Sequence, residues 1–330
     1  MAKKILVTPR FDSSAWIFLK SQSNLELKKF PESGDLPWAD IGQANGLIIR
    51  SQIRIDESFL KMAPQLQVIV TATSGFDHID LEATQRWGIT VMHAPTAHVE
   101  SVAQLTWSFI LNMSLGILSR HQKVKAGFWE REAQDGFELR GKALGIVGLG
   151  RIGSRVAELG KLWGMKVYAY DPYIEESVFR ETKVDRMGYE ELLKSSDVLT
   201  FHVPQSQETT GMLSRSHFEY INRGIVLVNT SRGKVISEEG LVEALEQKWV
   251  HAAALDVFEK EPLPRTSRLL NLPNVILTPH VGSCTEQAFH KASQEAADKI
   301  VRFFLDGVGT DTLPPKALWY TNKPPFLKPN

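Results

Sequence analysis

The sequence has almost no cysteine, no net charge and no long apolar run. Its single cysteine, Cys284, cannot form an internal disulfide, and the N-terminal residues lead into a strand pattern rather than a signal peptide, so we expect a cytoplasmic protein. Lys plus Arg and Asp plus Glu both total 38, which disfavours nucleic acid or a membrane surface as a partner. The most apolar stretch, Leu105–Leu118, is interrupted by polar side chains and is shorter than the roughly 20 residues of a membrane span. We expect a buried helix there.

Metal-binding spacings of His and Cys are also missing, so we expect no metal. What is present is an alternation of short apolar runs with helical patterns. The first group of predicted strands comprises Ile5–Val7, Leu25–Lys28, Gly46–Ile49, Gln67–Thr71 and Ile89–Met92, with helices such as Asp56–Met62 and Leu81–Trp87 between them. The second group comprises Ala143–Val147, Lys166–Tyr170, Val198–His202, Ile225–Asn229, Ala252–Asp256 and Val275–Leu277.

Many of these strands are apolar without alternation, as in parallel sheets covered by helices on both faces. We therefore predict an α/β fold of two doubly wound βαβ domains. The domain boundary is expected to be discontinuous, with residues 1–98 and 287–330 in one domain and 99–286 in the other. A helix from Val99 would lead into the second domain, and a helix over Thr285–Leu305 would lead back. The proline-rich segment Pro314–Asn330 is expected to be extended.

A glycine-rich motif, G-x-G-x-x-G, follows the strand Ala143–Val147 and precedes a helical pattern. Gly148 would permit a tight turn, Gly150 a close approach of the backbone to a pyrophosphate, and Gly153 close packing of helix on strand. The N–H groups of Arg151 and Ile152 would face the phosphates at the helix N-terminus.

Asp171 ends the next strand, 18 residues beyond Gly153, where a carboxylate can accept hydrogen bonds from an adenosine ribose. A carboxylate there would repel a 2′-phosphate, and no Arg or Lys follows at positions 172–174. The motif therefore predicts NAD as the cofactor. The alternative for Asp171 is an ordinary turn at a strand end.

Three ionisable residues follow predicted strand ends in the second domain, where ligands bind in open parallel sheets. They are Arg232, Glu261 and His280. A histidine can take the proton of a substrate hydroxyl as hydride leaves C2, the carbon that bears it. A carboxylate bonded to the other ring nitrogen would raise the pKa of the histidine. An arginine can bind a substrate carboxylate with two parallel hydrogen bonds. Each residue alone also has a simpler interpretation: Arg232 in a surface salt bridge, Glu261 as a solvated acid and His280 as the cap of a turn. Their common position favours hydride transfer.

These motifs resemble those of the D-isomer-specific 2-hydroxyacid dehydrogenases, and within that family the phosphoglycerate dehydrogenase subgroup most. Glu138–Gly153 is similar to the family's nucleotide segment. Segments around His202-Val203-Pro204 and Thr209, Asn229–Gly233, Ala254–Phe258 with Glu261, and Pro279–Gly282 follow in the family's order. The similarity extends to about Gly307.

The resemblance implies a Rossmann NAD-binding domain and a flavodoxin-like substrate domain with a cleft between them, closing over substrate in a homodimer formed through the NAD-binding domains. It places the catalytic roles on Arg232, Glu261 and His280, and the nicotinamide amide contact on Asp256 near Thr230. The implied cofactor contacts are Gly148, Gly150, Arg151, Ile152, Gly153, Asp171, His202, Val203, Pro204, Thr209, Thr230, Ser231, Asp256 and Gly282. Backbone N–H groups at Ser74 and Gly75 would hold the substrate carboxylate.

Some positions depart from the family pattern, namely Thr73 for glycine, His78 for asparagine and Gln104 for glutamate. Arg50-Ser51 and Trp129–Arg131 match phosphoglycerate dehydrogenase segments, so Arg50, Ser51 and Arg131 are candidate substrate contacts, and either arginine could meet a phosphate. Thr71 replaces an arginine common in that subgroup.

We expect oxidation of 3-phosphoglycerate to 3-phosphohydroxypyruvate. The alternatives are a glyoxylate/hydroxypyruvate reductase or another D-2-hydroxyacid dehydrogenase. A formate dehydrogenase is disfavoured because that branch pairs its histidine with glutamine. From another class, an NADH-sensing corepressor-like binding protein would keep the same three polar residues.

Overall fold

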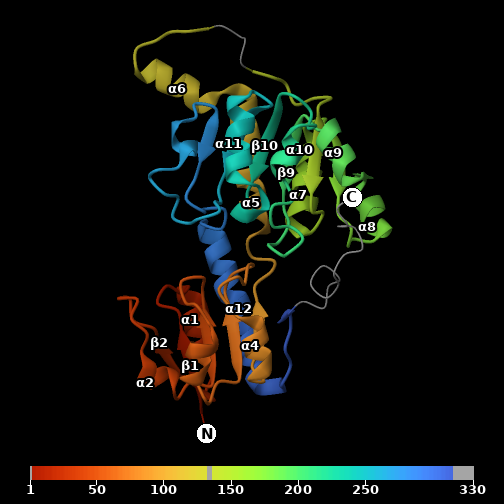
Figure 1. The fold of residues 1–330 in the computed structure, drawn as a ribbon. Helices are drawn as coiled ribbons and strands as arrows, with labels where there is room; N and C mark the ends of the chain where they lie inside the picture. Colours follow the sequence, from red (N-terminus) through yellow and green to blue (C-terminus); the bar gives the residue numbers. More distant parts are fainter. Residues whose placement is uncertain (1, 132–135, 315–330) are drawn as a thin grey trace. The chain divides into compact units, whose positions relative to one another are not determined.

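The structure is a computed structural model that describes residues 2–131 and 136–314. The chain forms two compact units (Figure 1). Unit 1 comprises the residues up to His98 and the segment from Ser283 onward, and unit 2 comprises Val99–Gly282. The second crossing therefore lies between residues 282 and 283, whereas the sequence predicted 286 and 287. The predictions for 315–330 lie outside the described residues.

Unit 1 is built on a six-stranded sheet in the order β13-β5-β4-β3-β1-β2. The strands are β1 (Lys3–Val7), β2 (Leu25–Lys29), β3 (Gly46–Ile49), β4 (Val68–Thr71), β5 (Thr90–His93) and β13 (Thr312–Leu313). The helices are α1 (Ser13–Lys20), α2 (Trp38–Ile41), α3 (Glu57–Lys61), α4 (Leu81–Arg86) and α12 (Glu286–Asp306). All strand pairs are parallel except β13 with β5, and β13 was not predicted.

Successive residues of these strands enter two different cores. Ile5 and Val7 pack in one core with residues of α1 and α12, while Leu6 packs in the other with residues of α2, α3 and α4. Because side chains alternate across a strand, this division shows that helices cover both faces of the sheet.

Unit 2 is built on a seven-stranded parallel sheet in the order β12-β11-β10-β9-β6-β7-β8. The strands are β6 (Ala143–Val147), β7 (Lys166–Tyr170), β8 (Asp185–Arg186), β9 (Val198–Phe201), β10 (Ile225–Asn229), β11 (Val250–Leu255) and β12 (Val275–Leu277). The helices are α5 (Val99–Leu115), α6 (Ile117–Lys125), α7 (Arg151–Leu162), α8 (Glu176–Thr182), α9 (Tyr189–Ser195), α10 (Arg215–Phe218) and α11 (Glu238–Glu246).

Again two cores flank the sheet. Ile146 packs with residues of α5, α7 and α8, and Val147 packs with residues of α9, α10 and α11. The predicted α/β class with two doubly wound sheets is thus confirmed.

Two strand ends differ from the prediction in a way that matters for the site. β9 ends at Phe201 and β11 at Leu255, so His202 and Asp256 are the first residues beyond their strands rather than strand residues. The strand order reverses between β6 and β9 in unit 2, because β7 and β8 lie on one side of β6 and the later strands on the other. Ligands bind beyond the carboxyl ends of the strands at such a switch point.

The apolar stretch Leu105–Leu118 is divided between two helices. α5 ends at Leu115, and Gly116, with φ 62°, separates it from α6. Trp107, Phe109 and Ile110 are buried in the unit 2 core as expected, whereas Leu115 and Leu118 are exposed. Within residues 2–131 and 136–314 no single helix has both the length and the apolarity to cross a membrane, although α5 and α6 together, bent by 62°, meet those criteria.

Candidate active site

The glycine-rich turn connects β6 to α7 at the switch point. A Cβ on Gly148, which has φ 92°, would lie 2.7 Å from the carbonyl oxygen of His202, and one on Gly153 would lie 2.0 Å from the carbonyl oxygen of Gly148. The protein's own packing therefore requires both glycines. A Cβ on Gly150 would meet nothing within 4 Å, so its small size leaves open space beside the backbone. That space suits a ligand.

The first turn of α7 adds donors to that space. Gly150 is the N-cap residue of α7, no side chain of the described chain caps the helix, and Arg151 and Ile152 are its first residues. The unpaired N–H groups and positive end of a twelve-residue helix suit a phosphate.

Asp171 connects the turn to the end of β7. Its Oδ2 accepts the Leu149 N–H (2.9 Å) and its Oδ1 accepts the Tyr173 N–H (3.0 Å). A carboxylate can accept about four hydrogen bonds, so it retains capacity for ribose hydroxyls. The position is the one expected for an adenosine ribose contact.

The loop after β9 forms the other side of the switch point. His202 Nε2 lies 3.0 Å from Thr200 Oγ1, while its Nδ1 is buried and has no partner among the described residues. Burial lowers the pKa of His202 to about 3, so the ring is neutral near pH 7. Beyond Val203, the Thr209 hydroxyl donates to the Pro204 carbonyl oxygen (2.6 Å) and stabilises the loop. The buried Nδ1 and the space at Gly150 both fit a dinucleotide.

The segment after β10 is shaped by Asn229, which sequence reasoning did not single out. Its side chain accepts from both the N–H and the hydroxyl of Ser231, at 3.0 and 2.8 Å, and donates to the Arg232 carbonyl oxygen at 3.0 Å. The Thr230 hydroxyl lies 3.0 Å from that of Thr106 on α5, and both groups are buried. These bonds fix the backbone from which Arg232 extends.

Gly233 brings the Arg232 segment against the loop after β11. A Cβ on Gly233 would lie 1.9 Å from the Phe258 carbonyl carbon, so only glycine allows this contact. The same loop carries Glu261, whose Oε1 accepts the Phe258 N–H at 3.1 Å. Arg232 and Glu261 are thus supported by two backbones in direct contact.

His280 and Glu261 form an ion pair at this edge of the sheet. Nδ1 of His280 lies 2.8 Å from Oε2 of Glu261. His280 has φ 54°, a left-handed conformation that is uncommon for residues other than glycine. Such conformations persist only where the surroundings impose them.

Asp256 supplies that constraint. It is 1% exposed, and its carboxylate accepts from the Thr278 hydroxyl (2.6 Å), the Val281 N–H (2.8 Å) and the Gly282 N–H (2.8 Å). These donors lie on both sides of His280 in the chain. Asp256, expected from the resemblance to face the nicotinamide, therefore also holds the turn that presents His280.

The charges at this edge favour the imidazolium. The hydrogen bond to Glu261 raises the pKa of His280 against the opposing effects of burial and of the Arg232 charge. Burial alone would raise the pKa of Glu261, but the hydrogen bonds from His280 and Phe258 and the charges of His280 and Arg232 together lower it. Since the charge of Arg232 acts on both partners, unit 2 brings the three predicted residues together.

Unit 1 holds the loop predicted to bind a carboxylate. The Ser74 hydroxyl donates to the Ala94 carbonyl oxygen (3.1 Å) and lies 3.0 Å from Nδ1 of His98, while the Thr73 hydroxyl donates to the Gly75 carbonyl oxygen (2.7 Å). Within the described contacts, the N–H groups of Ser74 and Gly75 have no protein acceptor. They are available to an anion.

Three of the four positions that depart from the family pattern lie in or next to this loop, and the fourth, Gln104, lies in α5. The Thr71 hydroxyl lies 2.6 Å from that of Thr73 and 3.0 Å from Nε2 of His78. Thr71, Thr73 and His78 thus form one hydrogen-bonded cluster at the carboxylate loop.

Arg50 follows β3 near this loop. Its guanidinium lies 4.6 Å from the ring centroid of Phe289, and its Nε and Nη2 are buried without a partner among the described residues. Burial lowers the pKa of Arg50, and the Arg50 charge, after burial, helps to lower the pKa of His98 to about 4. A partly buried guanidinium with two buried, unpaired donor nitrogens fits an anionic ligand. Ser51 and Arg131 are exposed, and none of the described contacts supports them.

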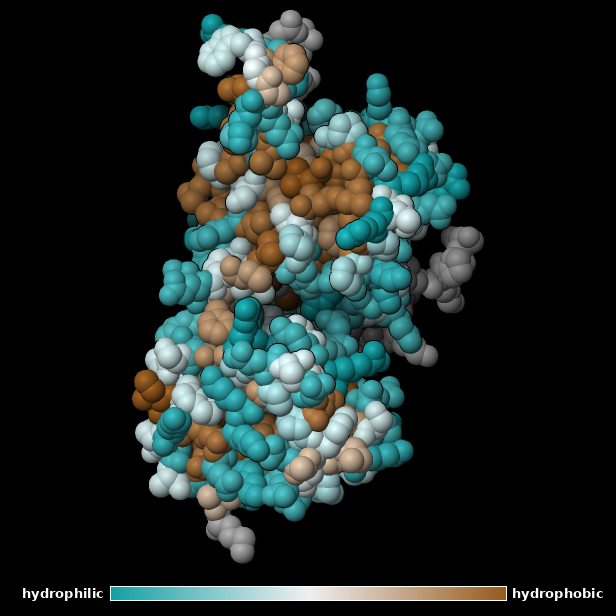
Figure 2. Space-filling view, turned by 90° about the vertical axis from the view of Figure 1, so that its left-hand side faces the viewer, coloured by the Kyte–Doolittle hydropathy of each residue, from teal (hydrophilic) through white to brown (hydrophobic). Residues whose placement is uncertain are grey.

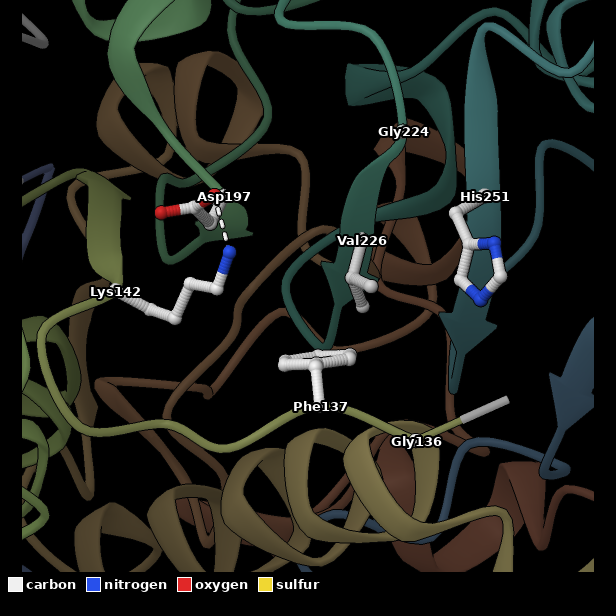
Figure 3. A pocket seen from close by; sticks show the side chains of 7 residues that line it. All are labelled: Gly136, Phe137, Lys142, Asp197, Gly224, Val226 and His251. Atoms are coloured by element: carbon white, nitrogen blue, oxygen red, sulfur yellow. Dashed lines mark hydrogen bonds and ion pairs between the residues drawn. The ribbon is translucent and has the colours of Figure 1, made fainter. Parts of the chain in front are cut away.

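A cavity of about 260 Å³ lies at the opposite edge of the unit 2 sheet (Figure 3). The side chains of Phe137 and Val226 line it, and the ion pair of Lys142 with Asp197 (3.2 Å) lies beside them. Because these residues lie at the amino ends of the strands, the cavity is separate from the candidate active site. Across residues 2–131 and 136–314, no three His, Cys, Asp or Glu side chains are grouped as metal ligands.

Comparisons with known proteins identify the family to which the chain is similar. A family model described as "D-isomer specific 2-hydroxyacid dehydrogenase, NAD binding domain" matches residues 107–282. The D-3-phosphoglycerate dehydrogenase of Archaeoglobus fulgidus is 37% identical over 262 residues, which cover 79% of this chain and 50% of that protein. The glyoxylate reductase of Aeropyrum pernix is 37% identical over 268 residues, 79% of this chain and 80% of that protein.

Among solved structures, the D-lactate dehydrogenase of Aquifex aeolicus complexed with NAD and lactic acid has a TM-score of 0.82 at 31% identity. The match covers 92% of this chain and 96% of that one. By contrast, the chain spans only about half the length of the phosphoglycerate dehydrogenases it matches, with 50% and 56% of two such proteins aligned.

Proposed function

Because the chain belongs to the D-isomer-specific 2-hydroxyacid dehydrogenase family, we propose that it is an oxidoreductase that uses NAD to transfer hydride at C2 of a D-2-hydroxy acid or the matching 2-keto acid. The observation that carries the proposal is the ion pair of His280 with Glu261, 2.8 Å apart and acted on by the charge of Arg232, at the same carboxyl edge of the sheet as the glycine-rich turn. NAD supplies the hydride acceptor or donor when bound.

The chain's own residues perform the remaining tasks. In unit 2, Arg232 binds and orients the substrate carboxylate. In unit 1, the N–H groups of Ser74 and Gly75 have no protein acceptor within the described contacts and can bind an anionic group. His280 takes the proton of the C2 hydroxyl in oxidation and returns it in reduction. Glu261 holds the imidazole by Nδ1 and leaves Nε2 for the substrate, while Asp256 fixes the turn.

An NADH absorbance assay with a panel of 2-keto acids tests the activity. Turnover of any member that depends on its C2 carbonyl supports an enzyme. Tight NADH binding with no turnover across the panel, together with binding of a peptide, would instead favour the corepressor-like alternative.

For the substrate we propose 3-phosphoglycerate, with 3-phosphohydroxypyruvate as the product. Arg50 supports this, because two of its donor nitrogens are buried and unpaired beside the carboxylate loop. Arg50→Gln is expected to raise KM for 3-phosphohydroxypyruvate about tenfold or more, the loss of roughly one charge-assisted hydrogen bond, and to change KM for glyoxylate less. An equal change for both substrates would assign Arg50 to a group that they share and count against phosphate recognition.

A glyoxylate or hydroxypyruvate reductase is the second candidate. The glyoxylate reductase of Aeropyrum pernix is as similar in sequence as the phosphoglycerate dehydrogenase and is matched over 80% of its length. In addition, Thr71 stands where the phosphoglycerate subgroup often has arginine. A higher kcat/KM for glyoxylate than for 3-phosphohydroxypyruvate in the same assay would select this candidate.

We also propose that the protein is a cytoplasmic homodimer that pairs through unit 2. Figure 2 shows a broad apolar area over unit 2. Unit 2 also exposes large apolar side chains, among them Leu115, Ile117, Leu118, Phe128 and Trp129, the last 79% exposed. Exposed apolar clusters of this kind commonly mark protein interfaces. Light scattering after gel filtration should give twice the chain mass, and a monomer at micromolar concentration would contradict the proposal.

A further inference from the structure

A side-chain contact joins the two loops that flank the glycine-rich turn. The Tyr173 hydroxyl donates a hydrogen bond to the carboxylate of Glu208. Tyr173 lies in the segment after β7, and Glu208 lies in the loop after β9. Since β6 lies between β9 and β7 in the sheet, the contact crosses the carboxyl end of β6, where the glycine-rich turn begins.

Tyr173 holds two carboxylates at once. Its backbone N–H binds Oδ1 of Asp171 at 3.0 Å, while its hydroxyl binds Glu208. Burial, the hydrogen bond to Glu208 and the charges of Glu208 and Asp171 all raise the pKa of Tyr173, so the phenol remains a proton donor. Burial, followed by the same two charges, also raises the pKa of Tyr170. Asp171 and Glu208 therefore share one neighbourhood.

Arg186, a cation that contacts the main chain of Asp171, directs its guanidinium elsewhere. Arg186 donates to the main-chain carbonyl of Asp171 at 3.4 Å, lies 3.5 Å from Glu176 and packs 5.1 Å from the ring centroid of Phe179. None of these three contacts involves the carboxylate of Asp171 or of Glu208. The end of the site where a ribose would lie thus carries two negative charges.

We propose that Glu208 is a second cofactor-selecting carboxylate, which acts with Asp171 to reject a 2′-phosphate, and that Tyr173 is the positioning residue that holds it over the adenosine end of the NAD site. Ribose hydroxyls donate hydrogen bonds to carboxylates, whereas a 2′-phosphate carries up to two negative charges that both acids repel. Removing Asp171 alone therefore leaves one repelling charge in place.

The test measures the dissociation constants of NAD and NADP by titration calorimetry on the intact chain, so that no turnover is needed. Glu208→Gln keeps an acceptor for the Tyr173 hydroxyl and removes the charge. It should tighten NADP binding about fivefold to tenfold, a typical charge effect near a protein surface, and leave NAD binding within twofold. Adding Asp171→Asn should lower the NADP-to-NAD ratio of dissociation constants beyond either single change.

Two further variants complete the test. Glu219→Gln removes an exposed charge near the amino end of β10 and should leave the ratio unchanged. Tyr173→Phe keeps the charge of Glu208 but releases it, so the ratio should shift in the same direction by less than in Glu208→Gln. A wild-type ratio in Glu208→Gln, or the same shift in Glu219→Gln, would overturn the proposal, and neither result would affect the proposed hydride transfer.

Discussion

Replacing Glu261 by glutamine removes the negative charge that faces His280 and keeps the size of the side chain at position 261. In the wild type the hydrogen bond from Nδ1 to Glu261 raises the pKa of His280, while burial and Arg232 oppose that effect. With glutamine the charge of Glu261 is lost, burial and Arg232 still lower the pKa of His280, and only the smaller effect of the Asp256 charge still raises it, so the pKa should fall. A charge-assisted hydrogen bond contributes about 1.5–3 kcal/mol, and 1.36 kcal/mol corresponds to one pKa unit. Since the side chains of His280 and Glu261 are 47% and 37% exposed, screening favours the lower limit, about one unit.

The assay is the pH dependence of kcat/KM for 2-keto acid reduction with NADH. Reduction needs a protonated His280, so the rate falls as pH rises through the pKa of His280. In Glu261→Gln this descending limb should move about one unit toward lower pH. A limb at the wild-type pH, with only a uniform loss of rate, would refute the assignment of Glu261 as the partner that sets the pKa of His280.

Further predictions concern the supports of the site. Gly150→Ala should leave the melting temperature unchanged but weaken NADH binding about tenfold or more. Gly153→Ala should instead lower the melting temperature, because its Cβ would lie 2.0 Å from a carbonyl oxygen. Equal changes of melting temperature in the two variants would contradict this distinction. Asp256→Asn, which loses acceptor capacity for three donors, should lower kcat about tenfold or more while NADH binding changes less; wild-type kcat would exclude this role. Hydrogen bonds from Ser14, Ala15 and His290 outweigh burial and lower the pKa of Asp12 to about 2, so its stabilising effect should be complete above pH 4 and be lost as pH falls through 2. Asp12→Ala should therefore lower the free energy of unfolding by about 1 kcal/mol at pH 7, as at other helix N-caps. The same loss of unfolding free energy at pH 2 and at pH 7 would contradict this role of Asp12.

Strand ends and glycine spacing could be read from the sequence because both depend on local chain geometry. Apolar runs predicted the two sheets, and a search of the few residues beyond each strand end singled out Arg232, Glu261 and His280. The short strand β13 could not be predicted, since two residues carry no periodicity and their pairing with β5 depends on the return of the chain.

Side-chain partners chosen by tertiary structure were also out of reach. The sequence placed His202 within β9, whereas it lies just beyond the strand with a buried, unpartnered Nδ1. The bonds of Asp256 to the turn around His280 join positions 22–26 residues apart, and the contact of Tyr173 with Glu208 joins two loops through the sheet order. For each of these contacts, the sequence offered only a polar residue near the end of a strand. Such a residue does not indicate which side chain or backbone group it will bind.

The central claim is that His280 carries the proton that moves as hydride is transferred at C2. The most direct measurement compares wild type with His280→Gln, recording single-turnover NADH oxidation by a 2-keto acid and NADH affinity on the same samples. The rate should fall by roughly 10²–10⁴ with NADH affinity within a few-fold of wild type. A variant that oxidises NADH at the wild-type rate would contradict the claim.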